Sequence, residues 1–313
     1  MRVKAEHVNY TYNPNTKFAV QALKDVSLTV EEGEFFGVIG HTGSGKSTFI
    51  QHLNGLLLLP SAQKKYKPKK PKKGAPVQPK TVLSVGEFDL TDKKTDFWKL
   101  RSKVGMVFQY PEYQLFAETV FDDVAFGLKN FSKEPLKAET VAEAVRNALE
   151  LVGLNYEDVK DKSPFDLSGG QKRRVAIAGV IVTRPEILVL DEPAAGLDPI
   201  GKQELMELLH KIHKEWCKTV IFVSHDMDEV AENCTNVAVF AGGEIKFVLP
   251  PRELFKKYDE LDALGLDLPA TAKVVRLLAR DGIHIDCDFT RKDFIEKISA
   301  YLRERGEGEN EKC

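Results

Sequence analysis

The residues best suited to do chemistry lie in one nine-residue stretch, Gly40-His41-Thr42-Gly43-Ser44-Gly45-Lys46-Ser47-Thr48. Gly43 and Gly45 let the backbone approach a ligand closely, so that its N–H groups can surround a phosphate chain. Lys46 can reach the terminal phosphates, and the Ser47 hydroxyl can ligate Mg²⁺. A lysine about 4 Å from a phosphate oxygen contributes roughly 4 kcal/mol at an intermediate dielectric. The stretch therefore predicts a nucleotide site and not a chance glycine-rich turn.

A second anion site is predicted at Ser168-Gly169-Gly170-Gln171. Ser168 occupies the N-cap position of an apolar helix expected over 172–182, and the two glycines leave N–H groups open at the positive end of its dipole. Such a sequence is unremarkable as a helix start alone. Its occurrence in the same chain as the first stretch makes it far more specific.

Two acids, Asp191 and Glu192, end an apolar run that is typical of a buried parallel strand. Ligands bind at the carboxyl ends of such strands in open α/β sheets. Asp191 can then hold the Mg²⁺ shell, while Glu192 polarises a water for in-line attack. Paired acids also cap strands or start turns, which would suit Pro193, but the apolar run before them favours the catalytic interpretation.

Gln109 and His225 also follow apolar runs. Gln109 can orient a water or ligate the metal, and His225 can donate to a phosphate oxygen. His210 and His213 superficially resemble a metal pair. Because no third ligand has suitable spacing, we expect them instead on one face of an amphipathic helix.

Tyr12 ends a strand expected over 3–12, just before a turn. An exposed aromatic there can stack on adenine, which is worth about 1–3 kcal/mol. Alternatively, Tyr10 or Tyr12 merely covers the face of a small sheet. Spacing alone leaves both interpretations open.

These residues require strands and helices that bring them together. Alternation and apolar runs predict strands over 3–12, 22–30, 34–39, 81–85, 104–108, 187–190, 220–225 and 244–249. Helices are expected over 46–57, 119–128, 139–152, 172–182, 202–216, 253–257, 270–279 and 290–305. The result is an α/β nucleotide-binding domain over 1–249 and a small, mostly helical domain over 250–313, which serves packing or dimerisation.

The composition is that of an ordinary soluble protein, with 45 basic and 47 acidic residues in 313 and 42% apolar residues. No apolar run approaches the roughly 18 residues of a membrane-spanning helix, and the first residues lack the apolar stretch of a secretory signal. The four cysteines are widely spaced, which predicts reduced structural thiols. They are Cys217, Cys234, Cys287 and Cys313.

Residues 60–80 break this composition with eight lysines, several prolines and no acid. Such a segment cannot bury apolar surface, so an extended, mobile loop is expected. It could contact an anionic membrane surface or a nucleic acid. A solvated insertion without a dedicated partner is the preferred interpretation.

The order of the motifs over about 220 residues resembles the nucleotide-binding subunits of ABC transporters. The motifs are Gly40–Thr48, Gln109, Leu167–Gln171, Ile187–Glu192, Ala195–Asp198 and His225. The resemblance implies a P-loop NTPase fold, with an ABC-type ATPase core that carries an antiparallel β subdomain and a helical subdomain. It also implies that two subunits close head-to-tail, with ATP between one P-loop and the other subunit's Ser168–Gln171.

The same resemblance assigns roles to single residues. Tyr12 would stack on adenine, Gln109 would form the Q-loop, Glu192 would be the general base and His225 the switch. Asp198 would lie in the loop that crosses the dimer interface.

The chain also resembles, more specifically, the ATPases of energy-coupling factor (ECF) transporters. The segments that carry this resemblance are Tyr10-Thr11-Tyr12, the P-loop, Asn54–Leu57 and Gln109–Phe116. Tyr10-Thr11-Tyr12 and the His-Thr of the P-loop look more like the second of the two ATPase paralogues. This implies Mg²⁺-dependent ATP hydrolysis that powers uptake of vitamins or transition-metal ions. The implied partners are a second, paralogous ATPase, a transmembrane coupling protein held near 110–116 and a substrate-capturing membrane protein. The chain would lie peripherally on the cytoplasmic face of the cell membrane, with no nucleic acid bound.

Other functions are less compatible with the sequence. The subunit could serve another ABC importer. Among non-transport ABC ATPases, a DNA-repair or chromosome-organising protein would need a long coiled coil between Gln109 and Ser168, and a translation-associated protein would need two cassettes. A scaffold without turnover conflicts with the presence of both Glu192 and His225.

Overall fold

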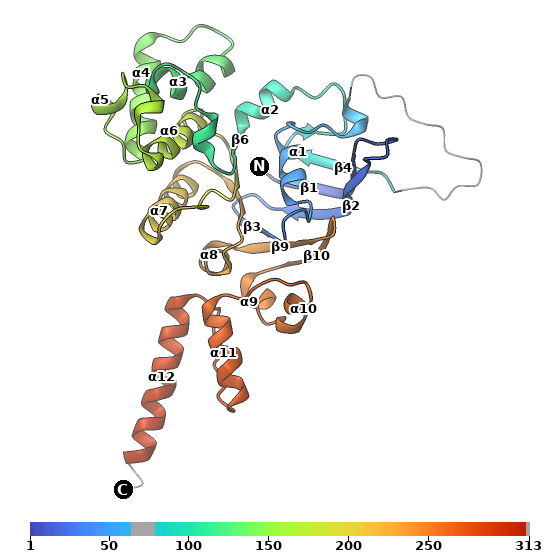
Figure 1. Cartoon of the computed structure of the whole chain (residues 1–313), viewed down its shortest axis with the longest axis vertical. Helices are drawn as coiled ribbons and strands as arrows, with labels where there is room; N and C mark the ends of the chain where they lie inside the picture. The colour runs from blue at the N-terminus through green and yellow to red at the C-terminus, as the bar shows by residue number, and fades with distance from the viewer. Residues whose placement is uncertain (64–78, 311–313) are drawn as a thin grey trace, which may run out of the picture.

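The computed structural model describes residues 1–63 and 79–310, and a six-stranded sheet lies at its centre (Figure 1). The strand order is β10-β9-β3-β8-β7-β6. The strands are β3 (Phe35–Ile39), β6 (Val104–Val107), β7 (Ile187–Asp191), β8 (Thr219–Val223), β9 (Asn236–Ala241) and β10 (Glu244–Leu249). All but β10 run parallel. Every residue of β3, β7 and β8 is buried, as expected for apolar strands covered on both faces.

The sheet order places four chain segments side by side at one edge. Strands β3, β8, β7 and β6 are consecutive neighbours, so the loops after their carboxyl ends meet there. These loops carry Gly40–Gly45, His225, Glu192 and Gln109, respectively. Parallel pairing therefore brings together groups that are far apart in the sequence.

A second, antiparallel sheet covers the start of the chain, in the order β2-β1-β4-β5. Its strands are β1 (Val3–Tyr12), β2 (Val20–Val30), β4 (Val82–Val85) and β5 (Phe88–Asp89). Alternation at the start of β1 buries Val3 and Ala5 against the core, and after a register shift Val8 is buried as well. The antiparallel subdomain predicted from this alternation is confirmed.

Helices pack on the central sheet and form a separate helical subdomain. Those near the sheets are α1 (Lys46–Leu53), α2 (Phe97–Lys103), α7 (Pro199–Glu215) and α8 (Met227–Asn233). The subdomain contains α3 (Val120–Phe131), α4 (Ala138–Leu151), α5 (Tyr156–Val159) and α6 (Gly169–Ile181). Short 3-10 helices are η1 (Pro60–Ala62), η2 (Pro111–Gln114) and η3 (Pro164–Asp166). In Figure 1 the helical subdomain lies apart from α1.

Helix α1 is shorter than predicted, ending at Leu53 and not at Leu57. Gly55 adopts a φ of +69°, and the N–H groups of Leu56 and Leu57 both return to the Gln51 carbonyl. A left-handed glycine with back-bonded N–H groups is a common helix stop. The chain therefore turns where the Asn54-Gly55 pair occurs.

The last segment contains α9 (Pro251–Leu254), α10 (Tyr258–Ala263), α11 (Ala270–Arg280) and α12 (Arg291–Asn310). The single helix expected over 253–257 is wrong, because Pro251 starts a helix earlier and that helix ends at Leu254. Leu254, Phe255 and Leu261 are fully buried against the main core. Helices α11 and α12 extend away from the rest of the molecule (Figure 1).

The lysine-rich segment is only partly described. The extended loop expected over 60–80 is wrong at its start, because Pro60–Ala62 form η1 and Ala62 is buried. Residues 64–78 lie outside the described residues. Cys217, Cys234 and Cys287 are free and buried, whereas Cys313 also lies outside. Over 1–63 and 79–310, no helix is both long and apolar enough to cross a membrane.

Candidate nucleotide-binding site

The loop between β3 and α1 forms a tight phosphate cradle. Gly40 has a φ of +143°, and a Cβ there would lie 2.2 Å from the Phe240 carbonyl oxygen. Gly45 has a φ of +106° and closes the loop where α1 begins. Only glycine permits both the conformation and the approach. The cradle therefore depends on glycine at these two positions.

Lys46 lies inside this loop and is only 4% exposed. Its Nζ donates to the carbonyl oxygens of Gly40 (2.5 Å) and His41 (3.0 Å). Burial lowers the pKa of Lys46, although the nearby Glu192 and Asp191 carboxylates oppose this effect. A desolvated ammonium held by two carbonyls gains strongly from an anionic ligand.

Ser47 and Asp191 supply oxygen atoms beside Lys46. Ser47 hydrogen-bonds to the Asp191 carboxylate, which is 8% exposed at the end of β7. Burial raises the pKa of Asp191, with the Ser47 hydrogen bond opposing and the Glu192 charge adding to the shift. A hydroxyl and one carboxylate fit Mg²⁺, which is usually held by few protein ligands together with phosphate oxygens.

Glu192 is the point at which the predicted catalytic residues meet. Its Oε1 lies 2.5 Å from His225 Nε2, and its Oε2 accepts a hydrogen bond of 2.9 Å from Gln109 Nε2. Its backbone φ is +51°, a left-handed conformation that costs a non-glycine residue about 1–3 kcal/mol. Such strain persists where surrounding contacts fix the residue. The amide of Gln109 thus contacts Glu192, and its role as a metal ligand stays a prediction.

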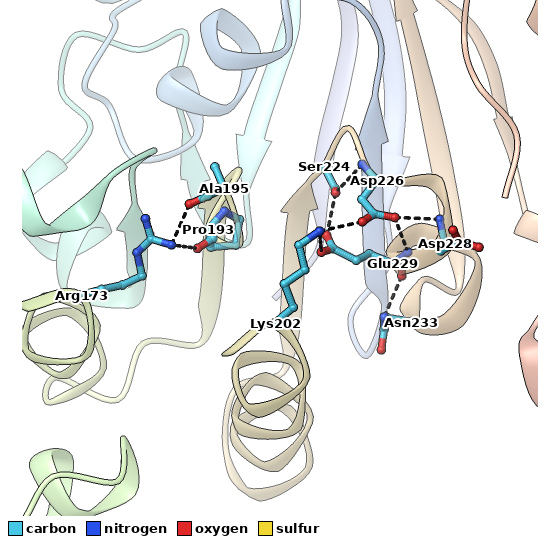
Figure 2. A network of polar contacts seen from close by, with 9 residues as sticks. All are labelled: Arg173, Pro193, Ala195, Lys202, Ser224, Asp226, Asp228, Glu229 and Asn233. Atoms are coloured by element: carbon cyan, nitrogen blue, oxygen red, sulfur yellow. Dashed lines mark hydrogen bonds and ion pairs between the residues drawn. The ribbon is translucent and has the colours of Figure 1, made fainter. Parts of the chain in front are cut away.

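A polar network fixes the residues on both sides of His225 (Figure 2). Lys202 Nζ donates to Asp226 Oδ2 at 2.7 Å and forms an ion pair with Glu229 Oε1 at 3.2 Å. The Ser224 hydroxyl donates to Glu229 Oε2 at 2.8 Å. The hydrogen bond to Asp226 raises the pKa of Lys202. The segment that carries His225 is therefore tied to α7 and α8.

Tyr12 lies beside the phosphate loop. Its hydroxyl is 3.1 Å from Thr48 Oγ1, and its ring meets Tyr10 edge to face at 5.0 Å. Tyr10 packs on the core and on the His52 ring, so it is the tyrosine that covers the sheet. The adenine-stacking role of Tyr12 stays a prediction.

Ser168 and Gln171 form a reciprocal capping box at the start of α6. The Ser168 Oγ accepts from the Gln171 N–H at 3.3 Å, and Gln171 Oε1 accepts from the Ser168 N–H at 3.1 Å. A Cβ at Gly169 or Gly170 would have no neighbouring atom within 4 Å, so the start of the helix is open. In Figure 1, α6 lies in the helical subdomain, away from α1. The fold does not bring this loop to the phosphate loop of the same chain.

Other parts of the site's surroundings were missed from the sequence. Arg173, Lys202 and Asp226 contact or belong to the loops that carry Glu192 or His225, and Glu112 pairs with Arg173. The signal for Arg173 and Lys202 would have been charge on α6 and α7 at positions that face the sheet edge, and the signal for Asp226 its place as the N-cap of α8. His210 and His213 pack around Phe35, and His210 Nε2 is 2.7 Å from Asn233 Oδ1.

A sequence model of the ABC transporter family matches residues 23–195, more than half of the chain. The chain belongs to the ABC transporter family. ABC proteins of this kind bind and hydrolyse ATP to drive transport, and the chain is an ABC ATPase.

Curated ABC relatives match nearly the whole chain. "Energy-coupling factor transporter ATP-binding protein EcfA2" of Caldanaerobacter subterraneus subsp. tengcongensis is 45% identical and aligns over 97% of this chain and 98% of its own length. The protein of the same name from Symbiobacterium thermophilum is 46% identical, over 96% and 95%. The resemblance to ECF ATPases, and to the second paralogue, is confirmed.

Solved ABC structures share the fold. The structure of cbiO1 from Clostridium perfringens, part of the ABC transporter complex cbiONQ, gives a TM-score of 0.66 at 35% identity and covers 88% of this chain and 98% of its own. A dimeric ATP-binding cassette in a post-hydrolysis state, bound to ADP and Pi, gives 0.65 at 28% identity and covers 79% and 98%. The predicted P-loop ABC ATPase fold is confirmed.

Proposed function

We propose that this chain hydrolyses ATP within an ECF-type importer with Glu192 as general base. The observation that carries this assignment is the convergence of Gln109 and His225 on the two carboxylate oxygens of Glu192. A carboxylate held at both oxygens can receive a proton from an attacking water in a fixed orientation. Gln109 would orient that water, and His225 would donate to the phosphate.

ATP would be held by the phosphate loop, with Tyr12 against adenine and Lys46 on the terminal phosphates. Mg²⁺ would be held by Ser47 and Asp191, where it would neutralise charge on the phosphates. Residues 168–171 would complete the site of a second, paralogous ATPase. The open start of α6 and its separation from α1 support a site shared between two subunits.

The membrane partner would cover an exposed aromatic surface that follows Gln109. Tyr113 is 85% exposed and Phe116 58% exposed, and Phe126 stacks edge to face on Phe116. Contiguous exposed apolar side chains mark interaction sites. We assign this surface to the transmembrane coupling protein, which would in turn engage a substrate-capturing membrane protein. The chain would then be peripheral on the cytoplasmic face of the membrane.

Residues 250–313 would act as a packing or dimerisation domain, joined to the ATPase domain of 1–249 by the buried Leu254, Phe255 and Leu261. Its outer helices leave apolar side chains uncovered. These are Val274, Leu277, Ile295 and Leu302. The corresponding domain of the second ATPase is the proposed occupant of this face.

The test is Glu192→Gln in the full chain together with its partner subunits. The amide keeps the contacts but cannot accept the proton, so ATP should bind and the dimer should close while turnover falls by about 10²-fold or more. Glu87→Gln, an exposed carboxylate paired with Lys99, is the matched control and should retain activity. Undiminished hydrolysis by Glu192→Gln would remove Glu192 as the base.

A further inference from the structure

Arg173 is a buried arginine of α6 whose guanidinium contacts two other segments of the chain. It is 6% exposed. Its Nε and Nη2 lie 3.3 and 3.4 Å from the two carboxylate oxygens of Glu112. Its Nη1 donates to the carbonyl oxygens of Pro193 (3.3 Å) and Ala195 (2.8 Å), as Figure 2 shows. Three structural elements therefore meet on one side chain.

One of these segments is the turn directly after Glu192. The left-handed backbone of Glu192 is held by its N–H, which donates to Val223, and by its carbonyl, which accepts from Ala195. Arg173 adds donors to the carbonyls of Pro193 and Ala195. Since a strained residue needs several fixed neighbours, loss of Arg173 would free the turn that aims the Glu192 carboxylate.

The other segment is η2, which carries the exposed ring of Tyr113 and is followed by that of Phe116. Glu112 is partly buried next to the exposed Tyr113 in the sequence, and η2 begins after Tyr110, another left-handed residue with a φ of +56°. A partner that presses on this surface would move Glu112. The fixed fork of a guanidinium would transmit that movement, because its N–H groups cannot reorient independently.

We propose that Arg173 is a positioning residue that couples η2 to the orientation of Glu192. This rests on the proposed function in taking Glu192 as the base. The simpler alternative is that Arg173 only neutralises Glu112. The two roles make different demands on residue 173. Neutralising Glu112 needs only an opposite charge, whereas the positioning role also needs N–H donors to the carbonyls of Pro193 and Ala195.

The experiment compares the full chain with its partner subunits as wild type, Arg173→Gln, Arg173→Lys and the exchange Glu112→Arg with Arg173→Glu. Arg173→Gln should lower kcat by about 10- to 100-fold, since small misplacements of a catalytic group cost that much, while KM for ATP changes less than about threefold. Arg173→Lys should recover only part of kcat. The charge exchange should recover none, because glutamate has no donor for the carbonyls.

Arg146→Gln is the matched control, since Arg146 pairs with Glu157 on the outside of the same helical subdomain. It should leave kcat unchanged. Wild-type kcat in Arg173→Gln, or full recovery by the charge exchange, would overturn the proposal. If Arg173→Gln does not fold, Arg173→Lys becomes the test of the proposal. Wild-type kcat in Arg173→Lys would then overturn the proposal. An active Glu192→Gln would instead overturn the proposed function.

Discussion

Asp191 is buried at the end of β7, and ionising it there costs free energy because its carboxylate loses water. Its pKa is raised in the folded chain, so its favourable contribution to stability is present below the ordinary aspartate range. That contribution is lost as pH rises through the elevated pKa. The residue is therefore kept at a cost to stability, which its chemistry explains.

Asp191→Asn should raise the melting temperature at neutral pH, because the amide keeps the Ser47 hydrogen bond without the desolvated charge. The difference in melting temperature between the variant and the wild type should be small near pH 4 and grow toward pH 7. The variant should also hydrolyse ATP about 10²-fold more slowly or worse. Thermal unfolding across this pH range measures the difference in melting temperature. A melting temperature below that of wild type at pH 7 would contradict the assigned cost of burial.

At the scale of elements, the capping box of α6 allows the effect of a helix cap on stability to be measured apart from its effect on ATP hydrolysis. Ser168→Ala should cost about 1 kcal/mol of unfolding free energy, because one N–H loses its acceptor. Thr119→Ala removes the equivalent cap of α3 and should cost a similar amount. Denaturant titration measures both.

Only Ser168→Ala should also lower the ATPase rate of the assembled dimer, since Ser168 would face the partner's nucleotide. Equal ATPase rates in the two variants would show that the α6 cap is structural alone.

Much of the site could be predicted because the ends of apolar strands can be recognised in the sequence. Glu192 and Gln109 are 83 positions apart and still meet, since each follows an apolar strand and β6 and β7 are neighbours. The contacts of Arg173 could not be predicted, because helix packing, and not a local pattern, decides which carbonyls a buried guanidinium reaches. The early end of α1 reflects a glycine conformation that periodicity alone does not reveal.

At the scale of the whole molecule, the last helical segment touches the phosphate loop. His41 Nε2 is 2.8 Å from the Leu264 carbonyl oxygen, a contact between residues 223 positions apart. The His41 carbonyl in turn accepts from Lys46. Gly265, with a φ of +68°, permits this approach, because a Cβ there would lie 2.8 Å from His41 Nε2. The C-terminal segment thus borders the nucleotide site directly.

Gly265→Ala should displace the His41 ring and weaken ATP binding about two- to tenfold, the worth of one hydrogen bond. Gly282→Ala is the matched control, with a φ of +77° and nothing within 4 Å of its Cβ. Both should lose similar stability from a left-handed alanine. Titration with a fluorescent ATP analogue distinguishes them, and equal affinities would show that the His41 contact does not matter.

The separation of α1 from α6 has a genetic consequence. If each pocket takes its phosphate loop from one subunit and its Ser168 loop from the other, Lys46 and Ser168 of this chain serve different pockets. Lesions at both positions in one gene copy would then silence both pockets, although the paralogue stays intact. The same two lesions divided between the paralogous genes, each at the corresponding position, would fall on a single pocket and spare the other. The loss of activity would therefore depend on how many pockets carry a lesion, and not on how many polypeptides do.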